Sequence, residues 1–460
     1  MEKLETKVQR QPSSEMLEAT ILAFLEEKKY TDLRALFLSI NPADIAYSFG
    51  ILPVEQLPLL FRLLPKELAA ETFVEMDAEE QALLIRSFSD SQLKDVVNEM
   101  YVDDAVDLVE EMPANVVRRI LRQVNPEMRK SINELLKYPE DSAGSIMTTE
   151  FVDLRPNMTV EEAIKRIRRI GVDKETIYTC YVIDSNRTLV GLVSVRTLLL
   201  AEESDIIADI METNVISAGT LDDQEEVAQK LTKYDFLAIP VVDGEGRLVG
   251  IITFDDAFDV LQEEVTEDIE KMAAITPSDK PYMRTGVFEI WSKRIPWLLI
   301  LMISATFTSM ILTTYEHALA AHVVLTAFIP MLMDTGGNSG SQASATIIRG
   351  LALTEIRFSD LFKVLSKEFR VALLCGITLS SATYLKLVFF DRVGVEVALV
   401  VSLTLICTIF FAKLVGCSLP MFAKKIGFDP AVMASPFITT IVDALSLLIY
   451  FQMASLLLHI

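Results

Sequence analysis

The sequence is poor in the residue types that build transition-metal and redox sites. It contains three histidines and four cysteines among 460 residues, and neither type recurs at a spacing typical of metal ligands or of a redox pair. Three of the cysteines lie inside apolar stretches, where cysteine ordinarily serves as a small packing residue: Cys375, Cys407 and Cys417. These absences argue against a zinc site and against thiol chemistry.

Two further absences narrow the class of protein. The sequence has no Gly-x4-Gly-Lys-Ser/Thr motif of the kind that cradles nucleotide phosphates, so an ATP-driven pump is poorly supported. The N-terminal segment 1–30 carries glutamate and lysine throughout and has no apolar core. We therefore expect no cleavable signal sequence, and we expect the N-terminal half to be cytosolic.

Charge and hydrophobicity are divided unevenly along the chain. The formal net charge is −23, although 51% of the residues are hydrophobic. Residues 277–460 hold 14 basic and 11 acidic side chains, whereas the part that precedes them, 1–276, holds 28 basic and 54 acidic ones. A strongly acidic soluble half is thus joined to a nearly neutral, apolar half. Because an acidic surface repels phosphate backbones and attracts cations, we expect no nucleic-acid partner.

Residues 1–137 predict an all-α, helical N domain. Apolar residues recur there at helical spacing, and residues typical of helix starts recur every 10 to 13 positions. These helix-start residues are Pro53, Pro65, Asp77, Asp90, Asp103, Pro113 and Asn125. Such regular steps favour short helix pairs stacked into a small solenoid, although an ordinary helical domain would show a similar pattern.

An internal repeat follows, with one copy in residues 138–200 and the other in 201–254. Two stretches of the first copy recur in the second: Ile146-Met147-Thr148 as Ile210-Met211-Glu212, and Leu189-Val190-Gly191-Leu192 as Leu248-Val249-Gly250-Ile251. The offset between the copies is shorter for the later stretch, so the first copy has a short insertion around 171–175. Each copy predicts strand, helix, strand, turn, strand and helix. The doubled pattern resembles a tandem pair of α+β CBS domains.

The CBS resemblance implies a regulatory module that is not catalytic. In that family many pairs bind adenine nucleotides in the cleft between the copies. The turn and strand-start residues expected to line this cleft are Ser194, Thr197, Phe236, Pro240 and Thr253. ATP binding at these residues and an empty regulatory fold both remain open.

Residues 255–276 predict one helix dense in carboxylates, which joins the repeat to the apolar half. Its acidic residues recur every three or four positions, and like charges at that spacing destabilise a helix. Taken alone, such a run is most often a solvated face. Divalent cations that bridge the helix to other acidic residues would relieve the repulsion, and the candidate partners are Glu225, Asp235, Asp103, Asp104 and Asp107.

The apolar half, residues 277–460, predicts a transmembrane domain with five spans. Its runs of spanning length lie near 296–315, 322–347, 371–390, 396–421 and 436–458. An odd number of spans and a cytosolic N-terminus place the C-terminus outside. The segments predicted to lie inside are rich in lysine and arginine and the outside loops hold almost none, in agreement with the positive-inside rule.

Two of the spans carry residues that are costly in lipid. The second ends in glycines and small polar residues over 330–342, which are tolerable where the backbone faces protein or water. The fifth holds Asp443, and an ionised aspartate at the bilayer centre costs roughly 3 kcal/mol on insertion scales. Such a cost is usually accepted for an ion or proton path. The alternative is a buried ion pair, for which Lys413 is the one good partner among the spans.

Ser435, Thr439 and Asp443 are spaced four residues apart, so they lie on one helix face. Their oxygen atoms suit a hydrated magnesium ion better than a transition metal, which would favour His or Cys. One carboxylate per chain on an axis shared by two chains would give two negative charges to match a divalent cation. This arrangement requires a homodimer.

The order of parts and the motifs resemble the MgtE-type magnesium transporter family over nearly the whole chain. The resemblance rests on the two CBS copies, the acidic helix, the five apolar runs, the Gly-Gly-Asn-Ser-Gly-Ser-Gln stretch at 336–342 and the pattern Asp429-Pro430-Ala431…Pro436…Asp443. It implies a dimeric, magnesium-selective channel in the bacterial inner membrane with Asp443 as the pore carboxylate. Asn338, Gly340 and Gln342 of the glycine-rich stretch then belong to the ion path. Relatives often carry Asn where this chain has Ser435.

The same resemblance makes the acidic helix a plug whose regulatory magnesium-binding region matches Asp256, Asp259, Glu264, Glu267 and Asp268. The implied function is not enzymatic. It is Mg2+ import down the electrochemical gradient, closed by Mg2+ bound to the N domain, CBS pair and plug. At 100 mV, inside negative, a divalent ion gains ~4.6 kcal/mol on entry. A proton-coupled divalent cation carrier and a non-conducting, membrane-anchored nucleotide sensor are the alternatives.

Overall fold

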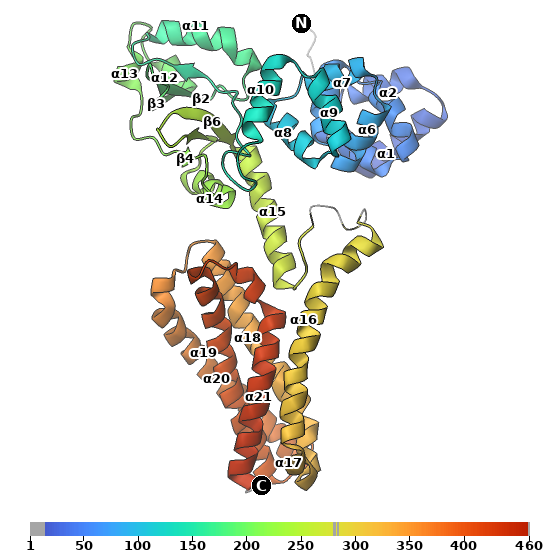
Figure 1. The fold of residues 1–460 in the computed structure, drawn as a ribbon, viewed down its shortest axis with the longest axis vertical. Coiled ribbons are helices and arrows are strands. Elements are labelled where there is room, and N and C mark those ends of the chain that lie inside the picture. Colours follow the sequence, from blue (N-terminus) through green and yellow to red (C-terminus); the bar gives the residue numbers. More distant parts are fainter. Residues whose placement is uncertain (1–13, 279–281, 283–284, 459–460) are drawn as a thin grey trace, which may run out of the picture. The chain divides into compact units, whose positions relative to one another are not determined.

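The computed structural model describes residues 14–278, 282 and 285–458. It separates into two compact units, Met1–Leu261 and Gln262–Ile460. The first unit holds short helices followed by two small sheets, and the second holds long helices (Figure 1). The four cysteines are free thiols.

The N-terminal part of the first unit is a stack of short helices, which confirms the all-α prediction. They are α1 (Ser14–Glu26), α2 (Tyr30–Phe37), α3 (Pro42–Ile51), α4 (Leu57–Phe61), α5 (Lys66–Val74), α6 (Ala78–Ser87), α7 (Asp90–Val97), α8 (Val102–Glu111), α9 (Ala114–Gln123) and α10 (Pro126–Leu135), with the 3-10 turn η1 (Val54–Gln56) before α4. Helices pack against the next but one: α1 with α3, α3 with α5, α5 with α7, α7 with α9, α4 with α6, and α8 with α10. This alternation is the packing of a small solenoid.

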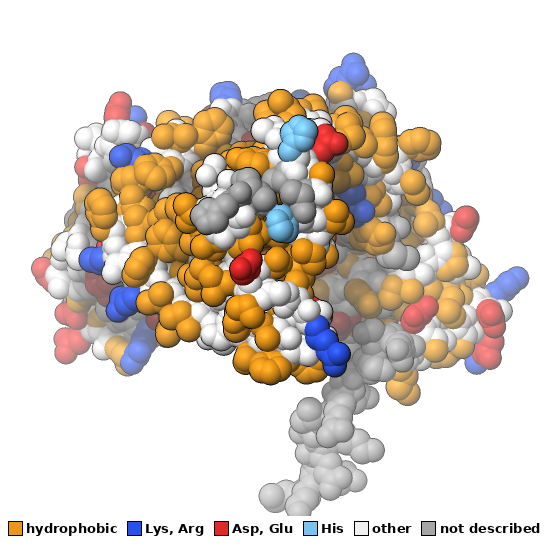
Figure 2. All heavy atoms as spheres, turned by 90° about the horizontal axis from the view of Figure 1, so that it is seen from below, with side chains coloured by type: hydrophobic (Ala, Val, Ile, Leu, Met, Phe, Trp, Pro, Cys, Tyr) orange, Lys and Arg blue, Asp and Glu red, His pale blue; other side chains and the backbone are white. Residues whose placement is uncertain are grey.

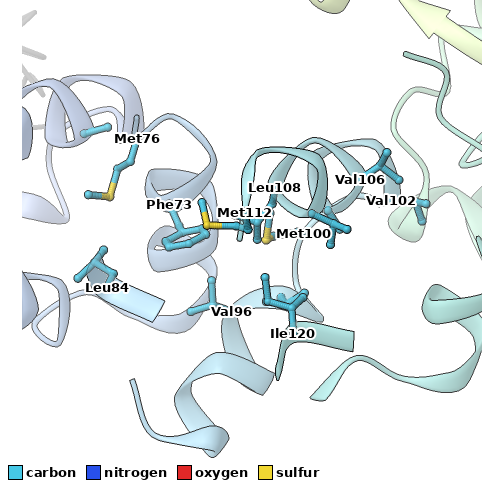
Figure 3. Packing of buried hydrophobic residues seen from close by; sticks show 14 of the residues in the cluster. Phe73, Met76, Leu84, Val96, Met100, Val102, Val106, Leu108, Met112 and Ile120 are labelled. Atoms are coloured by element: carbon cyan, nitrogen blue, oxygen red, sulfur yellow. The ribbon is translucent and has the colours of Figure 1, made fainter. Parts of the chain in front are cut away.

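Local capping explains where these helices begin. The Asn125 side chain accepts the N–H of Met128 at 2.8 Å, and Ser89 forms a reciprocal capping box with Gln92. Asp103, which the sequence suggested as a helix start, lies one residue inside α8. Apolar side chains from successive helices then fill a shared interior, as Figure 3 shows for residues between Phe73 and Ile120.

The two repeat copies fold into two three-stranded sheets with the same topology. The first copy contains β1 (Asp153–Leu154), α11 (Val160–Ile170), the 3-10 turn η2 (Gly171–Asp173), β2 (Thr179–Ile183), β3 (Leu189–Ser194) and α12 (Val195–Leu200). The second contains α13 (Ile207–Ile210), β4 (Ala218–Gly219), α14 (Gln224–Tyr234), β5 (Ala238–Val242) and β6 (Leu248–Thr253). In each sheet the first strand runs parallel to the second and the second antiparallel to the third.

The register of the two sheets repeats as the sequence does. Val182 pairs with Gly191 in the first copy, and Val241 pairs with Gly250 in the second. The insertion of the first copy forms η2 and the segment after it, which includes Glu175. The long helix α15 (Phe254–Met272) follows β6 directly and carries the acidic residues of the predicted connecting helix.

The second unit is built from α16 (Val287–Thr314), α17 (Glu316–Ala321), η3 (Val323–Phe328), α18 (Ile329–Ala352), η4 (Phe358–Asp360), α19 (Leu361–Phe389), α20 (Val395–Lys425), η5 (Pro430–Met433) and α21 (Ser435–Leu458). Helix α18 packs along both α20 and α21, and α19 packs along α20. Seen from the end that holds α17 and the C-terminus, hydrophobic side chains cover most of the near surface (Figure 2).

Length and composition mark four helical stretches of the described residues as able to cross a membrane: Val287–Thr314, Phe358–Phe389, Val395–Lys425 and Pro430–Leu458. The fifth expected span, near 322–347, corresponds to η3 and α18. Helix α18 has 24 residues, which is long enough to span, but its glycines and polar side chains keep it outside that group. The five-span topology therefore stays a prediction.

Candidate functional site

Three helices of the second unit cross closely at glycines. A methyl group in place of the Gly336 hydrogen would lie 2.6 Å from Cγ2 of Thr408 on α20 and 2.9 Å from Oγ of Ser446 on α21. At Gly340 it would lie 3.1 Å from the carbonyl oxygen of Ala412. Small residues let helix backbones approach in this way inside a membrane. Gly340, expected in the ion path, thus lies on the face of α18 that is buried against α20, which favours a packing role.

The opposite side of α18 carries a polar stripe. Asp334, Asn338 and Gln342 follow one another at four-residue steps and are all exposed in the single chain. Exposed amide and carboxylate groups are costly against lipid, so a stripe of them on a helix at membrane depth belongs against water or protein. Two of the predicted path residues, Asn338 and Gln342, are on this stripe.

Helix α21 brings the other predicted path residues to the same place. A methyl group on Gly337 would lie 3.0 Å from Cγ2 of Thr439, so the two helices touch there. The Thr439 hydroxyl donates to the carbonyl oxygen of Pro436 at 2.9 Å, which leaves its oxygen lone pairs available to a cation. Asp443 is half-buried, one turn further along α21, and Ser435 is the first residue of that helix.

The Asp443 carboxylate interacts electrostatically with a second carboxylate, Asp334. Sequence reasoning passed over Asp334, although an aspartate inside an apolar run is the same signal that drew attention to Asp443. Lys413, the basic residue considered as a partner for Asp443, instead forms a largely buried ion pair with Glu368, with Nζ 3.4 Å from Oε2. Within the described residues Asp443 forms no ion pair.

A second group of carboxylates lies in the first unit. Asp103 of α8, Glu150 before β1 and Glu175 after η2 each offer one oxygen, and the three oxygens lie within 4.8 Å of one another. Asp103 is 8% exposed. In the described part of the chain, Oδ1 of Asp103 and Oε2 of Glu175 are buried without a hydrogen-bond partner. Oxygen ligands at this separation fit a hard divalent cation such as Mg2+. We call these three residues the sensor cluster.

Two hydrogen bonds position Glu150 and Glu175 of the sensor cluster. The Glu175 N–H donates to the Glu150 carbonyl oxygen at 2.9 Å, which holds the inserted segment of the first CBS copy against the strand entry. The side chain of Glu150 accepts the N–H of Val102 at 3.2 Å at the start of α8. The sequence pointed to Asp103 but not to Glu150 or Glu175, and the one signal among the latter two was the insertion that includes Glu175.

Further carboxylates surround the sensor cluster and repel one another. Burial and then the charge of Asp256 raise the pKa of Asp104 and of Asp107, each to about 7. The same two causes raise the pKa of Glu175 to about 8 and hold the pKa of Asp103 well above its ordinary value. Asp103, Asp104, Asp107 and Asp256 of the predicted regulatory set are therefore together. Burial also raises the pKa of Asp259.

The remaining predicted regulatory residues lie elsewhere. Glu225 is in the first turn of α14, where the Gln229 amide donates to it at 3.0 Å, and Asp235 caps the other end of that helix in a left-handed conformation. Glu264 lies on α15 between Asp259 and Glu267. Glu225, Asp235 and Glu264 are not in the sensor cluster as the described residues form it.

The far end of α15 contacts the segment before α21. Lys271 places its Nζ 2.6 Å from Oε1 of Glu267 and 2.7 Å from Oδ2 of Asp429. Asp429 also accepts the N–H of Ala431 at 2.7 Å and so caps η5. Burial and then the charge of Asp429 raise the pKa of Asp268. Glu267 and Asp268 thus belong to a junction of their own, which we call the linker junction.

Two of the candidate nucleotide residues, Ser194 and Thr253, occupy matching positions in the two copies. Ser194 ends β3 and caps α12 by accepting the N–H of Thr197 at 3.0 Å, and Thr253 ends β6 directly before α15. The Thr253 hydroxyl hydrogen-bonds to Asp256. Pro240 lies in β5, and Phe236 stacks on Tyr234 with the ring centroids 5.5 Å apart.

Comparison with known proteins agrees with this architecture. The family model "Divalent cation transporter" matches residues 329–453, "MgtE intracellular N domain" matches 40–141, and "CBS domain" matches 143–204 and 207–263. The chain is 39% identical over 450 residues to the magnesium transporter MgtE of Thermus thermophilus, covering 97% of this chain and 99% of the relative. It is 33% identical to the magnesium transporter MgtE of Bacillus subtilis, covering 95% and 97%.

A solved structure matches the first unit. The crystal structure of the cytosolic domain of the Mg2+ channel MgtE in complex with ATP is 37% identical, with a TM-score of 0.51, and covers 53% of this chain and 99% of that chain.

A helical solenoid, a CBS pair and a bundle of long apolar helices with a polar stripe together define a membrane transport protein with a large N-terminal part. The extent of the matches identifies the family within that class. The chain belongs to the MgtE family of magnesium transporters, which is a transport family and not a family of enzymes.

Proposed function

We propose that this protein is a magnesium-selective channel that lets Mg2+ enter down its electrochemical gradient and that closes when Mg2+ binds its soluble half. The observation that carries the proposal is Asp443. It is half-buried in an apolar helix, beside Thr439 and the polar stripe of α18, and its one basic candidate partner is paired with Glu368. A carboxylate held in this way suits a hydrated divalent ion.

The ion path is completed by a second copy of the chain. In a single copy the stripe of Asp334, Asn338 and Gln342 is exposed, on a helix that we propose to span the membrane. A two-fold partner that packs over this face would remove the stripe from lipid and bring two Asp443 carboxylates to one axis. Two negative charges would then face one divalent cation, so we propose a homodimer.

The orientation in the bilayer follows from charge. Lysine and arginine concentrate in the first turns of α16, around the connection between α18 and α19, and in the last turn of α20, and they include Lys293, Arg294 and Lys424. We therefore place the soluble half in the cytosol of a bacterial cell and the C-terminus outside, with α18 as the fifth span of an inner-membrane protein. Helix α18 packs lengthwise against α20 and α21, both long enough to cross a membrane, which supports that reading.

Closure by Mg2+ rests on the sensor cluster and its neighbours. Burial and then the charges of neighbouring carboxylates raise the pKa values of Asp104, Asp107 and Glu175, so these groups repel one another when they are ionised. A divalent cation would neutralise the repulsion and hold α8 of the N domain, the first CBS copy and the start of α15 together. Because a bound ion favours the compact arrangement, rising Mg2+ shifts the population toward the closed channel.

We further propose that the CBS pair binds ATP through Ser194, Thr197, Phe236, Pro240 and Thr253. Support comes from the paired placement of Ser194 and Thr253 at equivalent strand ends, and from the matching MgtE cytosolic domain, whose crystal structure is in complex with ATP. Calorimetry of the full chain with ATP should show saturable heat that a Thr253→Ala variant loses. Absence of heat in wild type, with and without Mg2+, would leave the pair as an empty regulatory fold.

The function is tested by single-channel recording of the purified full-length protein in planar bilayers. Mg2+ is the only permeant cation, and its concentration is varied on the side of the soluble half. We expect currents that need no proton gradient and that stop as Mg2+ on that side rises. Flux that requires a proton gradient would establish the carrier alternative, and no flux in folded protein would establish the non-conducting sensor.

A further inference from the structure

The contacts between α18 and α21 fix which residues of the two antiparallel helices lie level with each other. Residues further along α18 contact residues further back along α21 or in η5, which precedes α21. The contacts are Gly336 with Val442 and Ser446, Gly337 with Thr439, Gly340 with Ile438 and Val442, and Ser344 with Met433. Since both helices rise by the same step per residue, about 1.5 Å, this register continues to neighbouring residues. It places Asp334 level with Asp443, Asn338 with Thr439, and Gln342 with Ser435.

Two of these level pairs, Asp334 with Asp443 and Asn338 with Thr439, also lie on the same side of the two helices. Gly336, Gly340, Ile438 and Val442 face α20 or pack between the helices, and all are buried. With about 100° between successive residues of a helix, Asp334 and Asn338 project from the side of α18 turned away from α20, and Asp443 projects from the same side of α21. The electrostatic interaction between the Asp334 and Asp443 carboxylates agrees with this placement.

From this geometry we propose that Asp334 is a second specificity-determining carboxylate of the ion path, level with Asp443. The inference rests on the proposed channel function. Two carboxylates per chain on a shared axis would give a ring of four, where Asp443 alone would give two. A ring of higher charge concentrates divalent cations over monovalent ones at the entrance to the binding level, because the attraction scales with the charge of the ion.

The exposed position of Asp334 strengthens the argument. A carboxylate that faces lipid within a span is costly, and the described residues offer Asp334 no ion pair that would offset the cost. On the ion path the same carboxylate stays hydrated and meets cations. The other two side chains of the stripe, Asn338 and Gln342, are neutral, so Asp334 is the one residue of the stripe that carries a charge.

Mg2+ uptake by proteoliposomes of the full-length protein tests the inference with Asp334→Asn and Asp334→Glu. We expect Asp334→Asn to raise the half-saturating external Mg2+ concentration by roughly five- to tenfold and to increase Na+ leak when Mg2+ is absent. Asp334→Glu keeps the charge and should restore both values toward wild type. Glu396→Gln, which removes one exposed charge at the start of α20 away from the stripe, is the matched control and should change neither.

The half-saturating Mg2+ concentration and the Na+ leak distinguish a role of Asp334 on the ion path from a structural role. If Asp334→Asn only loosened a helix contact, Asp334→Glu would not restore these two values. Half-saturation and Na+ leak unchanged in Asp334→Asn, with Asp443→Asn inactive, would overturn this inference and leave the channel assignment standing. Activity unchanged in both variants would overturn both. If Asp334→Asn yields no folded protein, wild-type half-saturation in Asp334→Ser would overturn the inference, and a raised value there would support it.

Discussion

The two carboxylate groups of this protein differ in what surrounds them. In the sensor cluster Asp103 and Glu175 each have an oxygen that is enclosed by protein and lacks a hydrogen-bond partner among the described residues. Along α18 and α21, Asp334 is exposed in one chain and Asp443 is half-buried. Enclosed carboxylates have lost their hydration and favour a bound cation as a counter-charge, whereas carboxylates open on one side stay hydrated and can release it. The same ligand chemistry thus suits sensing in one unit and passage in the other.

The largest effect is expected at the path. Asp443→Asn keeps the shape of the side chain and removes one charge per chain from the ion-binding level. The loss of a close carboxylate contact to a divalent ion should lower Mg2+ conductance by about a hundredfold or more, since contacts of this kind are worth several kcal/mol. Single-channel recording and sedimentation measure conductance and assembly together. Full conductance in an intact dimer would remove Asp443 from the path.

The second largest effect is expected when the acidic residues of α15 are neutralised, and it distinguishes Mg2+ sensing from Mg2+ conduction. Neutralising Asp256, Asp259, Glu264 and Glu267 together should leave conductance unchanged but abolish closure by internal Mg2+, because α15 would lose the carboxylates whose repulsion Mg2+ is proposed to relieve. The soluble half should also resist protease better without Mg2+, since the repulsion is gone. A variant that neutralises two exposed acids outside α15, Glu127→Gln with Glu134→Gln of α10, is the control. Closure of the quadruple variant at the wild-type Mg2+ concentration would make α15 an ordinary solvated helix.

Much of the fold and part of the candidate sites were predictable from the sequence. The features that were not predicted depend on contacts between segments far apart in the chain. Helix starts and the internal repeat are local signals, so their spacing favoured a solenoid and the doubled pattern resembled a CBS pair. Asp443 stood out because a charge in an apolar run is rare. Glu150 and Glu175 meet Asp103 only through tertiary folding. Asp334 carried the same local signal as Asp443, but spacing along the chain contains no register between α18 and α21 that would have placed the two aspartates level with each other. The Glu368 partner of Lys413 was missed for the same reason.

A third prediction uses the pKa values of the first unit. Asp104 and Asp107 have pKa values of about 7 and Glu175 of about 8, all above the ordinary carboxyl range, so the folded state binds more protons than the unfolded state between about pH 4 and pH 8. Stability of the soluble half without Mg2+ should therefore fall as pH rises from 5 to 8, by several kcal/mol at about 1.4 kcal/mol per unit of pKa difference.

Limited proteolysis of the full-length protein at pH 5 and pH 8, with chelator or with Mg2+, measures this dependence. Mg2+ should restore resistance at pH 8 and have little effect at pH 5. Asp104→Asn with Asp107→Asn should flatten the pH profile, whereas Asp32→Asn with Asp209→Asn, at two exposed aspartates remote from the sensor cluster in sequence, should not. A profile that rises with pH in the absence of Mg2+ would contradict the assigned repulsion.

The smallest effect is expected at the linker junction, where a lysine stands in the position that a cation would take. Lys271 contacts Glu267 and Asp429, with Asp268 nearby, and so neutralises the junction without a metal. In Lys271→Met these carboxylates would lose that counter-charge and bind Mg2+ more tightly. Partly exposed ion pairs contribute about 0.2–1 kcal/mol, so the internal Mg2+ concentration that half-closes the channel should fall by roughly two- to fivefold.

Lys230→Met removes a comparable pair with Asp222, outside the junction, and should leave that concentration unchanged. A rise in the half-closing concentration would instead mean that Lys271 itself helps to hold the channel shut, as a fixed tie between α15 and the segment that precedes α21.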